Sequence, residues 1–326
     1  MAEITKLRHL TSAGLMDCKK ALAETNGDIE AAVEILRKKG QAVAAKREDR
    51  QASEGCVLAK NEGNFAAIVA LNCETDFVAK NAGFVELTKK ILDAAVANRV
   101  KSLDELKALS IDGLTIADLV IEESGKTGEK TEISAYEYIE APGTNSYNHL
   151  GNKLSTIVGF NIENVDNQVG RDVAMQVASM NPVAVSRDTV PASVIESEKT
   201  VAIEKTKEEQ IKKAVEAALK KAGINPNLVD TPDHVESNIA KGWLTREEAD
   251  KAAVIAKETA EAKAANLPEQ MIQNIATGRL NKFFKESTLL EQEFIKDPEL
   301  TIEKYLAKAQ EGLTVVAFKR VNLNED

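Results

Sequence analysis

Residues 56–81 read CVLAKNEGNFAAIVALNCETDFVAKN. Two apolar runs flank the turn signal NEGN, and this pattern predicts a β-hairpin. A helix is expected next, because Phe84 and Ile91 are spaced to lie on one face and to pack against the hairpin. A third strand is expected at residues 131–140. These elements predict a small subdomain with a three-stranded antiparallel sheet and a helix, at residues 55–140.

The same order of two strands and a helix returns in the second half of the chain. A second hairpin is expected within residues 146–161, followed by a helix from about Asn167 and, at the far end of the chain, a strand at residues 314–323. Because the chain leaves this subdomain and later returns to complete it, another segment is inserted between the two parts. We therefore expect a second, related subdomain at residues 141–197 and 265–326, and an α+β fold class.

The inserted segment, residues 198–264, has the pattern of long helices. Its apolar positions, among them Ile211 and Leu219, form narrow stripes between many Lys and Glu residues. Thr245 and Glu248 make a capping-box pattern at the start of another long helix. Stripes this narrow do not bury a wide core, so we expect an antiparallel helical arm that packs like a coiled coil. The pattern leaves open whether the arm joins two copies into a homodimer.

Residues 1–54 have the pattern of a small helical module followed by a connector. Cys18 and Leu22 recur on one face of a helix, and a second helix follows. Gly40 is expected to end this second helix. The charged residues 41–54 then predict a helical or flexible connector. Because helices this short bury little surface, the module is expected to serve in docking.

The composition excludes several classes of protein. Asp and Glu outnumber Lys and Arg by 52 to 42, which gives a formal net charge of -10, and aromatic residues make up 4% of the chain. A nucleic-acid site needs a concentrated cationic face and aromatic side chains for stacking, so we expect protein partners and no nucleic acid. The apolar runs are shorter than the roughly 18 residues of a membrane span. We expect a cytoplasmic protein without membrane contact.

The sequence does not predict chemistry of its own. The three cysteines, Cys18, Cys56 and Cys73, include no CxxC pair and are expected to be reduced and buried. Cys73 is followed by Glu74 and Asp76, whose negative charges would raise the pKa of its thiol and make it a poor nucleophile. The three histidines lack the spacing of metal ligands. We therefore expect a protein that is not an enzyme, with no catalytic residue, no metal and no cofactor.

The tripeptide GKT at residues 125–127 resembles the end of a phosphate-binding loop. That loop requires an earlier Gly in the pattern GxxxxGK, and the matching position in this chain is Val120. We expect a solvated turn at this place. No direct nucleotide binding is predicted.

Phe77 allows two interpretations. Phe65 and Leu71 lie on the inner face of the second strand, and a continued strand would send Phe77 to that face as well. Alternatively, residues 74–76 end the strand and leave Phe77 exposed at the start of the next helix. An exposed Phe gives up roughly 1.5 to 3 kcal/mol of burial, which is recovered when a partner supplies a pocket. The residues alone leave both interpretations open.

Five stretches, in order along nearly the whole chain, resemble one family. They are TSAGLMDCKKAL (residues 11–22), NGDIEAAVEILRKKG (26–40), CETDFVAKN (73–81), DVAMQVASMNP (172–182) and GRLNKFFKESTLLEQEF (278–294). Together they are similar to bacterial translation elongation factor Ts. Residues 205–255 look like extra length over the common form, and residues 148–155 hold fewer glycines than the family tends to have.

The resemblance implies a guanine nucleotide exchange factor that binds elongation factor Tu·GDP, disturbs its magnesium and phosphate site and promotes GDP release in translation. It also implies a UBA-like fold for the amino-terminal module. Asp76 and Phe77 would push between helices of the partner's nucleotide domain, while Leu15 and Met16 would hold another helix of that domain. The main helix of the second subdomain would meet the partner as well. The implied partner-binding residues are Leu15, Met16, Thr75, Asp76, Phe77, Val78, Met175 and Gln176.

Two other hypotheses belong to different classes. One is a non-enzymatic scaffold or chaperone-like adaptor that uses the helical module and the arm to hold other proteins. The other, a hydrolase that uses Cys73, would lose all activity in Cys73→Ser. Deletion of residues 205–255 separates exchange from scaffolding, because exchange should survive the deletion and an arm-based scaffold should not.

Overall fold

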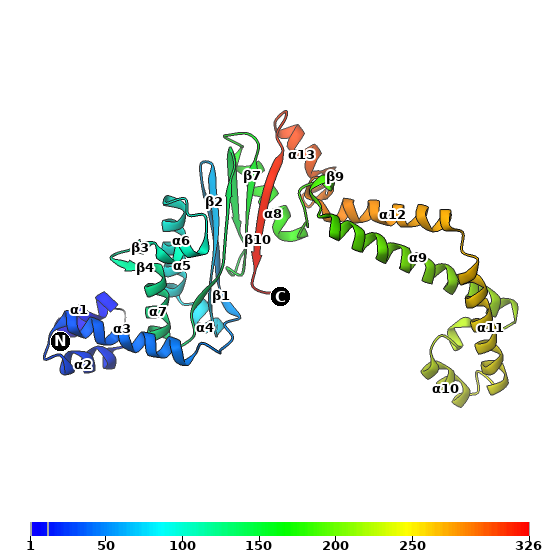
Figure 1. Ribbon diagram of the computed structural model, residues 1–326, viewed down its shortest axis with the longest axis horizontal. Coiled ribbons are helices and arrows are strands. Elements are labelled where there is room, and N and C mark those ends of the chain that lie inside the picture. The colour runs from blue at the N-terminus through cyan, green and yellow to red at the C-terminus, as the bar shows by residue number, and fades with distance from the viewer. Residues whose placement is uncertain (1, 12, 326) are drawn as a thin grey trace. The chain divides into compact units, whose positions relative to one another are not determined.

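The computed structural model describes residues 2–11 and 13–325. The chain divides into two compact units, Met1–Val185 with Leu289–Asp326 and Ser186–Thr288 (Figure 1). The first unit combines helices with three-stranded antiparallel sheets, and the second unit is helical. The predicted α+β fold class is therefore confirmed. Within the described ranges, no helix combines the length and the apolar character that a membrane crossing requires.

The amino-terminal module is built on a small apolar core. Leu7, Cys18, Leu22 and Ala32 are buried in it, and each of three helices contributes at least one of them. The helices are α1 (Ala2–Thr11), α2 (Leu15–Glu24) and α3 (Ile29–Lys46).

Gly40 does not end α3, so this sequence-based prediction is wrong. Its physical role is close helix packing. A Cβ atom on Gly125, which belongs to α7 (Ile116–Thr127), would lie 2.4 Å from the Cα atom of Gly40. The two helices therefore touch backbone to backbone, an approach that side chains would prevent. Arg37 of α3 also pairs with Asp118 of α7 at 2.9 Å, and both contacts dock the module on the first sheet's subdomain.

The first sheet has the antiparallel order β1-β2-β5. The predicted hairpin and third strand are confirmed, and α5 packs on one face through Phe84 and Ile91. The elements between α5 and β5 were not among the sequence-based predictions. The bounds are β1 (Glu54–Glu62), β2 (Phe65–Cys73), α5 (Ala82–Ala97), α6 (Leu103–Ala108), β3 (Ser110–Ile111), β4 (Leu114–Thr115) and β5 (Glu132–Glu140).

Strand β2 is buried along its whole length. Phe65 and Leu71 belong to the core beneath α5, whereas Ile68 packs in another apolar layer with Ile157 of the second sheet. Since neighbouring side chains of a strand point to opposite faces, one strand serves two cores. The chain that leaves β2 at Cys73 therefore starts from a fixed base.

The second sheet has the order β6-β7-β10 and repeats the topology of the first. Its closing strand comes from the far end of the chain, as predicted, and α8 packs on it through Val173 and Val177. The bounds are β6 (Gly143–Asn148), β7 (Leu154–Phe160), α8 (Asn167–Met180), a 3-10 turn (Leu289–Glu291), β8 (Glu293–Phe294), β9 (Asp297–Thr301), α13 (Ile302–Ala309) and β10 (Val315–Asn322).

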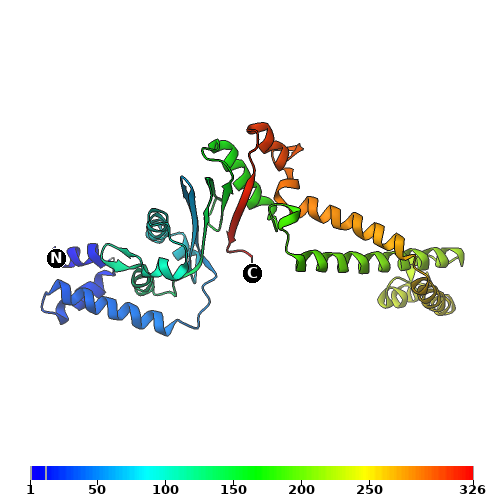
Figure 2. The ribbon, with the colours of Figure 1, turned by 45° about the horizontal axis from the view of Figure 1, so that its top comes forward.

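The second unit is an arm in which α11 and α12 return along α9 (Figures 1 and 2). This unit is wider than the predicted residues 198–264, because α12 also pairs with α9, where Arg279 contacts Glu209 at 2.6 Å. Residues 265–288 therefore belong to the helical unit and not to the second sheet's subdomain. The bounds are α9 (Ala192–Lys221), α10 (Pro232–Ala240), α11 (Arg246–Ala265) and α12 (Glu269–Ser287), with 3-10 turns at Arg187–Thr189 and Pro226–Leu228.

Candidate functional site

The junction between β2 and α5 exposes an aromatic side chain. Thr75 caps a single helical turn, α4 (Asp76–Ala79), because its hydroxyl accepts a hydrogen bond from the backbone N–H of Val78. Phe77 in this turn is 84% exposed, whereas Ala79 is buried and Val78 packs against the first core. The strand does not continue to Phe77. The exposed interpretation of this residue is confirmed, and the buried one is wrong.

Asp76 adds a negative charge beside the exposed ring. Its carboxylate accepts a hydrogen bond from Lys80 Nζ at 2.6 Å. This bond is the main cause that lowers the pKa of Asp76 below its usual range. The carboxylate is therefore ionised at neutral pH, and the turn presents an apolar ring next to an anionic group.

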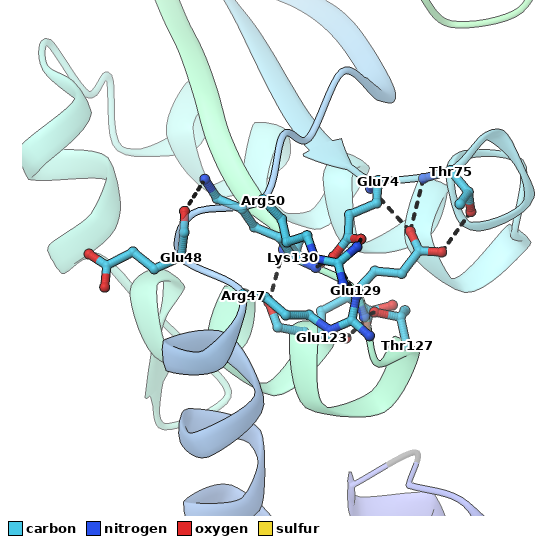
Figure 3. Close-up of polar contacts among 11 residues, drawn as sticks. Arg47, Glu48, Arg50, Glu74, Thr75, Glu123, Thr127, Glu129 and Lys130 are labelled. Carbon is cyan, nitrogen blue, oxygen red and sulfur yellow. Dashed lines mark hydrogen bonds and ion pairs between the residues drawn. The ribbon is translucent and has the colours of Figure 1, made fainter.

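Polar contacts tie the base of this junction to two other segments (Figure 3). The Glu129 carboxylate accepts hydrogen bonds from residues 74–75. The Glu74 carboxylate in turn accepts from the backbone N–H of Lys130 and from Arg47 Nη1, each at 2.7 Å. The Lys130 N–H is the largest cause that lowers the pKa of Glu74, and Arg47 lowers it further. The junction is thus bound to Glu129 and Lys130, which follow α7 in the chain, and to Arg47, which follows α3.

The first turn of α2 carries two further exposed apolar side chains. Leu15 is 52% exposed and Met16 is 71% exposed, whereas Cys18 and Leu22 of the same helix are buried in the core of the module. Apolar groups of this size in water at the start of a helix add nothing to the module's own core. They are available for contact with another molecule.

Gln176 does not fit its predicted place in a partner contact. Its side chain is 0% exposed, and its amide nitrogen donates to Gln292 Oε1 and to the Glu293 carbonyl. Its Oε1 accepts from the backbone N–H of Ile295 at 2.9 Å. The amide ties α8 to the β8 segment, so the prediction of a direct contact is corrected. Met175, on the same helix, is half-buried and stays accessible.

Comparisons with known proteins point to one family. A family model described as Elongation factor TS matches residues 74–246 and 210–325. The chain is 59% identical over 327 residues to Elongation factor Ts of Phocaeicola vulgatus, with 100% of this chain and 99% of the relative covered. It is 46% identical over 325 residues to Elongation factor Ts of Porphyromonas gingivalis, with 99% and 98% covered. This chain belongs to the elongation factor Ts family.

Membership in the elongation factor Ts family makes the chain a translation elongation factor that works in protein biosynthesis. The two alignments run through residues 205–255, which were predicted to be extra length over the common form. Relative to these two family members, the arm is therefore of ordinary length. The two exposed sites, at Phe77 and at Leu15 with Met16, lie in the first unit, as do the two three-stranded sheets.

The GKT tripeptide forms neither a solvated turn nor a phosphate loop. Residues 125–127 are the last turn of α7, and Gly125 lies against Gly40 in the helix crossing. Thr127 Oγ1 donates to the carbonyl of Glu123 at 2.8 Å. The predicted turn is corrected, because local helix bonds and the crossing fix this segment.

The cysteines are free and buried, as predicted. Burial is the main cause that raises the pKa of the Cys73 thiol to about 12, and the charge of Glu129 raises it further. The sequence pointed instead to the neighbouring Glu74 and Asp76 as the charges responsible. In the described part of the chain, no cluster of His, Cys, Asp and Glu is arranged to hold a metal ion.

Glu129 is a residue that sequence reasoning missed. It lies 54 positions from Thr75 in the chain, and an isolated acidic residue after a helix has no distinctive pattern. A partial signal was present in Gly128, which ends α7 with a φ of +72° and turns the chain toward β2. Recognition of that helix end would have placed Glu129 in a turn, although not beside Thr75.

Proposed function

We propose that this chain is a guanine nucleotide exchange factor that binds elongation factor Tu·GDP, disturbs its magnesium and phosphate site and promotes GDP release. The observation that carries the proposal is the exposure of Phe77, at 84%, on a turn that begins from a strand buried on both faces. A large apolar ring held outward on a fixed base is suited to enter a pocket of a partner. Membership in a family of translation elongation factors favours a translation GTPase as the partner. It also implies a cytoplasmic location.

The proposed activity needs no chemical groups in this chain. GTPases hold a nucleotide through Mg²⁺ and through backbone N–H groups on its phosphates. A protein that displaces these groups weakens the binding of the nucleotide without making or breaking a covalent bond. We therefore infer that the chain is not an enzyme in the strict sense and binds no nucleotide itself.

Binding linkage makes such a factor reversible. The factor weakens the affinity for GDP to the same degree that GDP weakens the affinity for the factor. The exchange factor must therefore bind the nucleotide-free partner better than the loaded one. Separate contacts suit this requirement, and the exposed Leu15 and Met16 supply a second apolar contact, with Met175 as a third.

Release of a fluorescent GDP from elongation factor Tu tests the proposal. Addition of this chain should accelerate release, and Phe77→Ala should reduce the stimulated rate by about 10-fold to 100-fold, which corresponds to about 1.5 to 3 kcal/mol of lost burial. Trp243→Ala is a matched control, because Trp243 is another aromatic side chain, 65% exposed, that lies in the arm. This control should leave the rate unchanged.

Two outcomes would contradict the proposal. One is GDP release that the chain does not accelerate, and the other is full stimulation by Phe77→Ala. The scaffold hypothesis makes the opposite prediction for the arm. If deletion of residues 205–255 abolished the chain's association with its partners while Phe77→Ala had no effect, scaffolding would be favoured over exchange.

A further inference from the structure

The turn that carries Phe77 needs support from outside itself. Helix α4 spans the four residues Asp76–Ala79. A single helical turn costs more conformational entropy than its own hydrogen bonds return. Contacts at both ends must therefore hold it. At the carboxyl-terminal end Val78 and Ala79 pack against the first core, and the amino-terminal end is held by polar groups.

Glu129 is presented to that amino-terminal end by the termination of α7. Gly128 follows the helix with a φ of +72°, a conformation that side chains disfavour, and reverses the chain direction. The backbone N–H of Glu129 then donates to Thr127 Oγ1 at 3.2 Å. The backbone of Glu129 is thus fixed, and its side chain points to residues 74–75 (Figure 3).

Three hydrogen bonds converge on the Glu129 carboxylate. Oε2 accepts from the backbone N–H groups of Glu74 at 3.1 Å and Thr75 at 3.0 Å, and Oε1 accepts from Thr75 Oγ1 at 2.7 Å. A hydroxyl carries one proton, so the bond to Glu129 leaves only lone pairs on Thr75 Oγ1 to face the rest of the turn. Val78 N donates to these lone pairs at 3.4 Å. Glu129 therefore sets the orientation in which Thr75 caps α4.

The contact is reciprocal. While Glu129 accepts from the backbone of Glu74, the carboxylate of Glu74 accepts from the backbone N–H of Lys130 at 2.7 Å. Two neighbouring residues of one segment are thus bound to two neighbouring residues of the other. Ionised acceptors make such bonds stronger than neutral ones. We call Glu74, Thr75, Glu129 and Lys130 the reciprocal clamp.

We propose that Glu129 is a positioning residue for Phe77: its carboxylate holds the cap of α4 in the orientation from which the ring enters the partner. This inference rests on the proposed exchange function. Glu129 acts through Thr75 and needs no contact with the partner. The clamp assigns a role in exchange to a residue 54 positions away from Thr75 in the chain.

The test compares two Glu129 variants with a matched control. Glu129→Ala removes all three bonds and should lower stimulated GDP release about 10-fold, since bonds to a charged group are strong enough to shift the turn's population by that factor. Glu129→Gln keeps an acceptor for the two backbone N–H groups, but its amide N–H cannot accept the hydroxyl proton of Thr75, so one of the three bonds is lost. It should show a smaller loss. Glu140→Ala, which removes a carboxylate bound to Arg99 and Lys101, should leave the rate unchanged.

A double-mutant cycle separates positioning from a general structural role. In a Phe77→Ala background, Glu129→Ala should change GDP release less than about twofold, because coupled residues are not additive. Equal losses in both backgrounds would overturn the proposal. Hydrogen–deuterium exchange of residues 74–79 provides an independent readout, and Glu129→Ala should accelerate it while Glu140→Ala does not.

The two readouts keep this inference distinct from the proposed function. If the single variant Phe77→Ala stimulated GDP release as strongly as the wild type, the proposed function of Phe77 would be contradicted. The amide exchange of residues 74–79 would still decide whether Glu129 holds the turn. Unchanged amide exchange in Glu129→Ala would overturn the positioning role, even if Phe77 proved essential.

Discussion

The junction after β2 and the junction after β7 occupy equivalent places in two subdomains of the same topology, yet they treat apolar side chains in opposite ways. After β2 the chain forms α4 and exposes Phe77. After β7 the chain turns Ile162 and Val165 against the second core before α8 begins. At the first junction Val78 and Ala79 still pack against the first core, but the largest apolar side chain, Phe77, does not.

The difference shows what an outward-facing side chain requires. The second junction closes on its neighbours, since the amide of Asn161 bonds to Thr314 N and the carbonyl of Gly312, and Asp166 caps α8 directly. At the first junction, hydrogen bonds that the Glu129 carboxylate accepts from Glu74 and Thr75 supplement the packing of Val78 and Ala79. A repeated scaffold can thus leave one of its two junctions free for binding while the other is used for stability.

The largest change in stability is expected where the second junction is most crowded. A Cβ atom on Gly143 would lie 2.4 Å from the carbonyl oxygen of Ile162. Gly143→Ala should therefore force the backbone apart and lower the free energy of unfolding by about 1 to 3 kcal/mol, as measured by urea denaturation. Gly278→Ala, where no atom outside the surrounding helix backbone lies within 4 Å of the added Cβ, is the control and should be neutral or slightly stabilising. A wild-type midpoint for Gly143→Ala would show that the junction is less tightly packed.

The helix caps should have equal value in the two halves. Asp166 accepts from the N–H groups of Gln168 and Val169 at the start of α8, and Asn81 accepts from the N–H of Gly83 at the start of α5. Replacement of either cap by Ala should cost about 1 kcal/mol of unfolding free energy, measured by thermal or urea unfolding. A much larger loss in one half would mean that the two junctions differ in more than the direction of their apolar groups.

The first junction should weaken in acid. In the folded chain the pKa of Glu74 is lowered from its ordinary value of 4.5. Its carboxylate therefore stabilises the fold above pH 4.5, and this stabilisation is lost as the pH falls through the lowered pKa. Glu74→Gln should therefore be less stable than the wild type at neutral pH, and the gap should close in acid. Urea denaturation as a function of pH measures the gap. A gap that widened on acidification would contradict the assigned direction.

The smallest change in stability is expected at the exposed ring of Phe77. Phe77→Ala removes a ring that makes little contact with its own chain, so the free energy of unfolding should change by less than about 0.5 kcal/mol. Ile162→Ala, at the second junction, should cost more because that side chain packs against a core. Thermal unfolding of both variants makes the comparison. A clear loss of stability in Phe77→Ala would mean that the ring also serves the fold.

Elements that depend on near neighbours were predictable from the sequence. The hairpins, the closing strand and the capping box of Thr245 with Glu248 follow from local alternation and turn chemistry, and all are present. Gly40 misled the prediction because its signal is that of a helix end, whereas its role depends on Gly125, far along the chain.

The candidate site was predictable only in part. Residue patterns left the exposure of Phe77 open, because alternation along the strand and the polar residues after it gave opposite answers. Gln176 was placed in a partner contact by resemblance, but a buried amide network holds it. Gly128 could have placed Glu129 in a turn but not beside Thr75, since hydrogen bonds between distant segments depend on the packing of α7 and not on spacing in the chain.

The glycine crossing of α3 and α7 has a consequence for binding strength. Because Gly40 and Gly125 bring the two backbones into contact, the module with Leu15 and Met16 is packed onto the subdomain that carries Phe77. In the proposed complex, Leu15 with Met16 forms one binding site and Phe77 forms the other, so the chain acts as a bivalent ligand. Once one site has bound, the other is held at a high effective concentration near the partner, and a long flexible linker would lower that concentration. The two glycines would then strengthen binding without touching the partner, because their close contact holds the two apolar sites together.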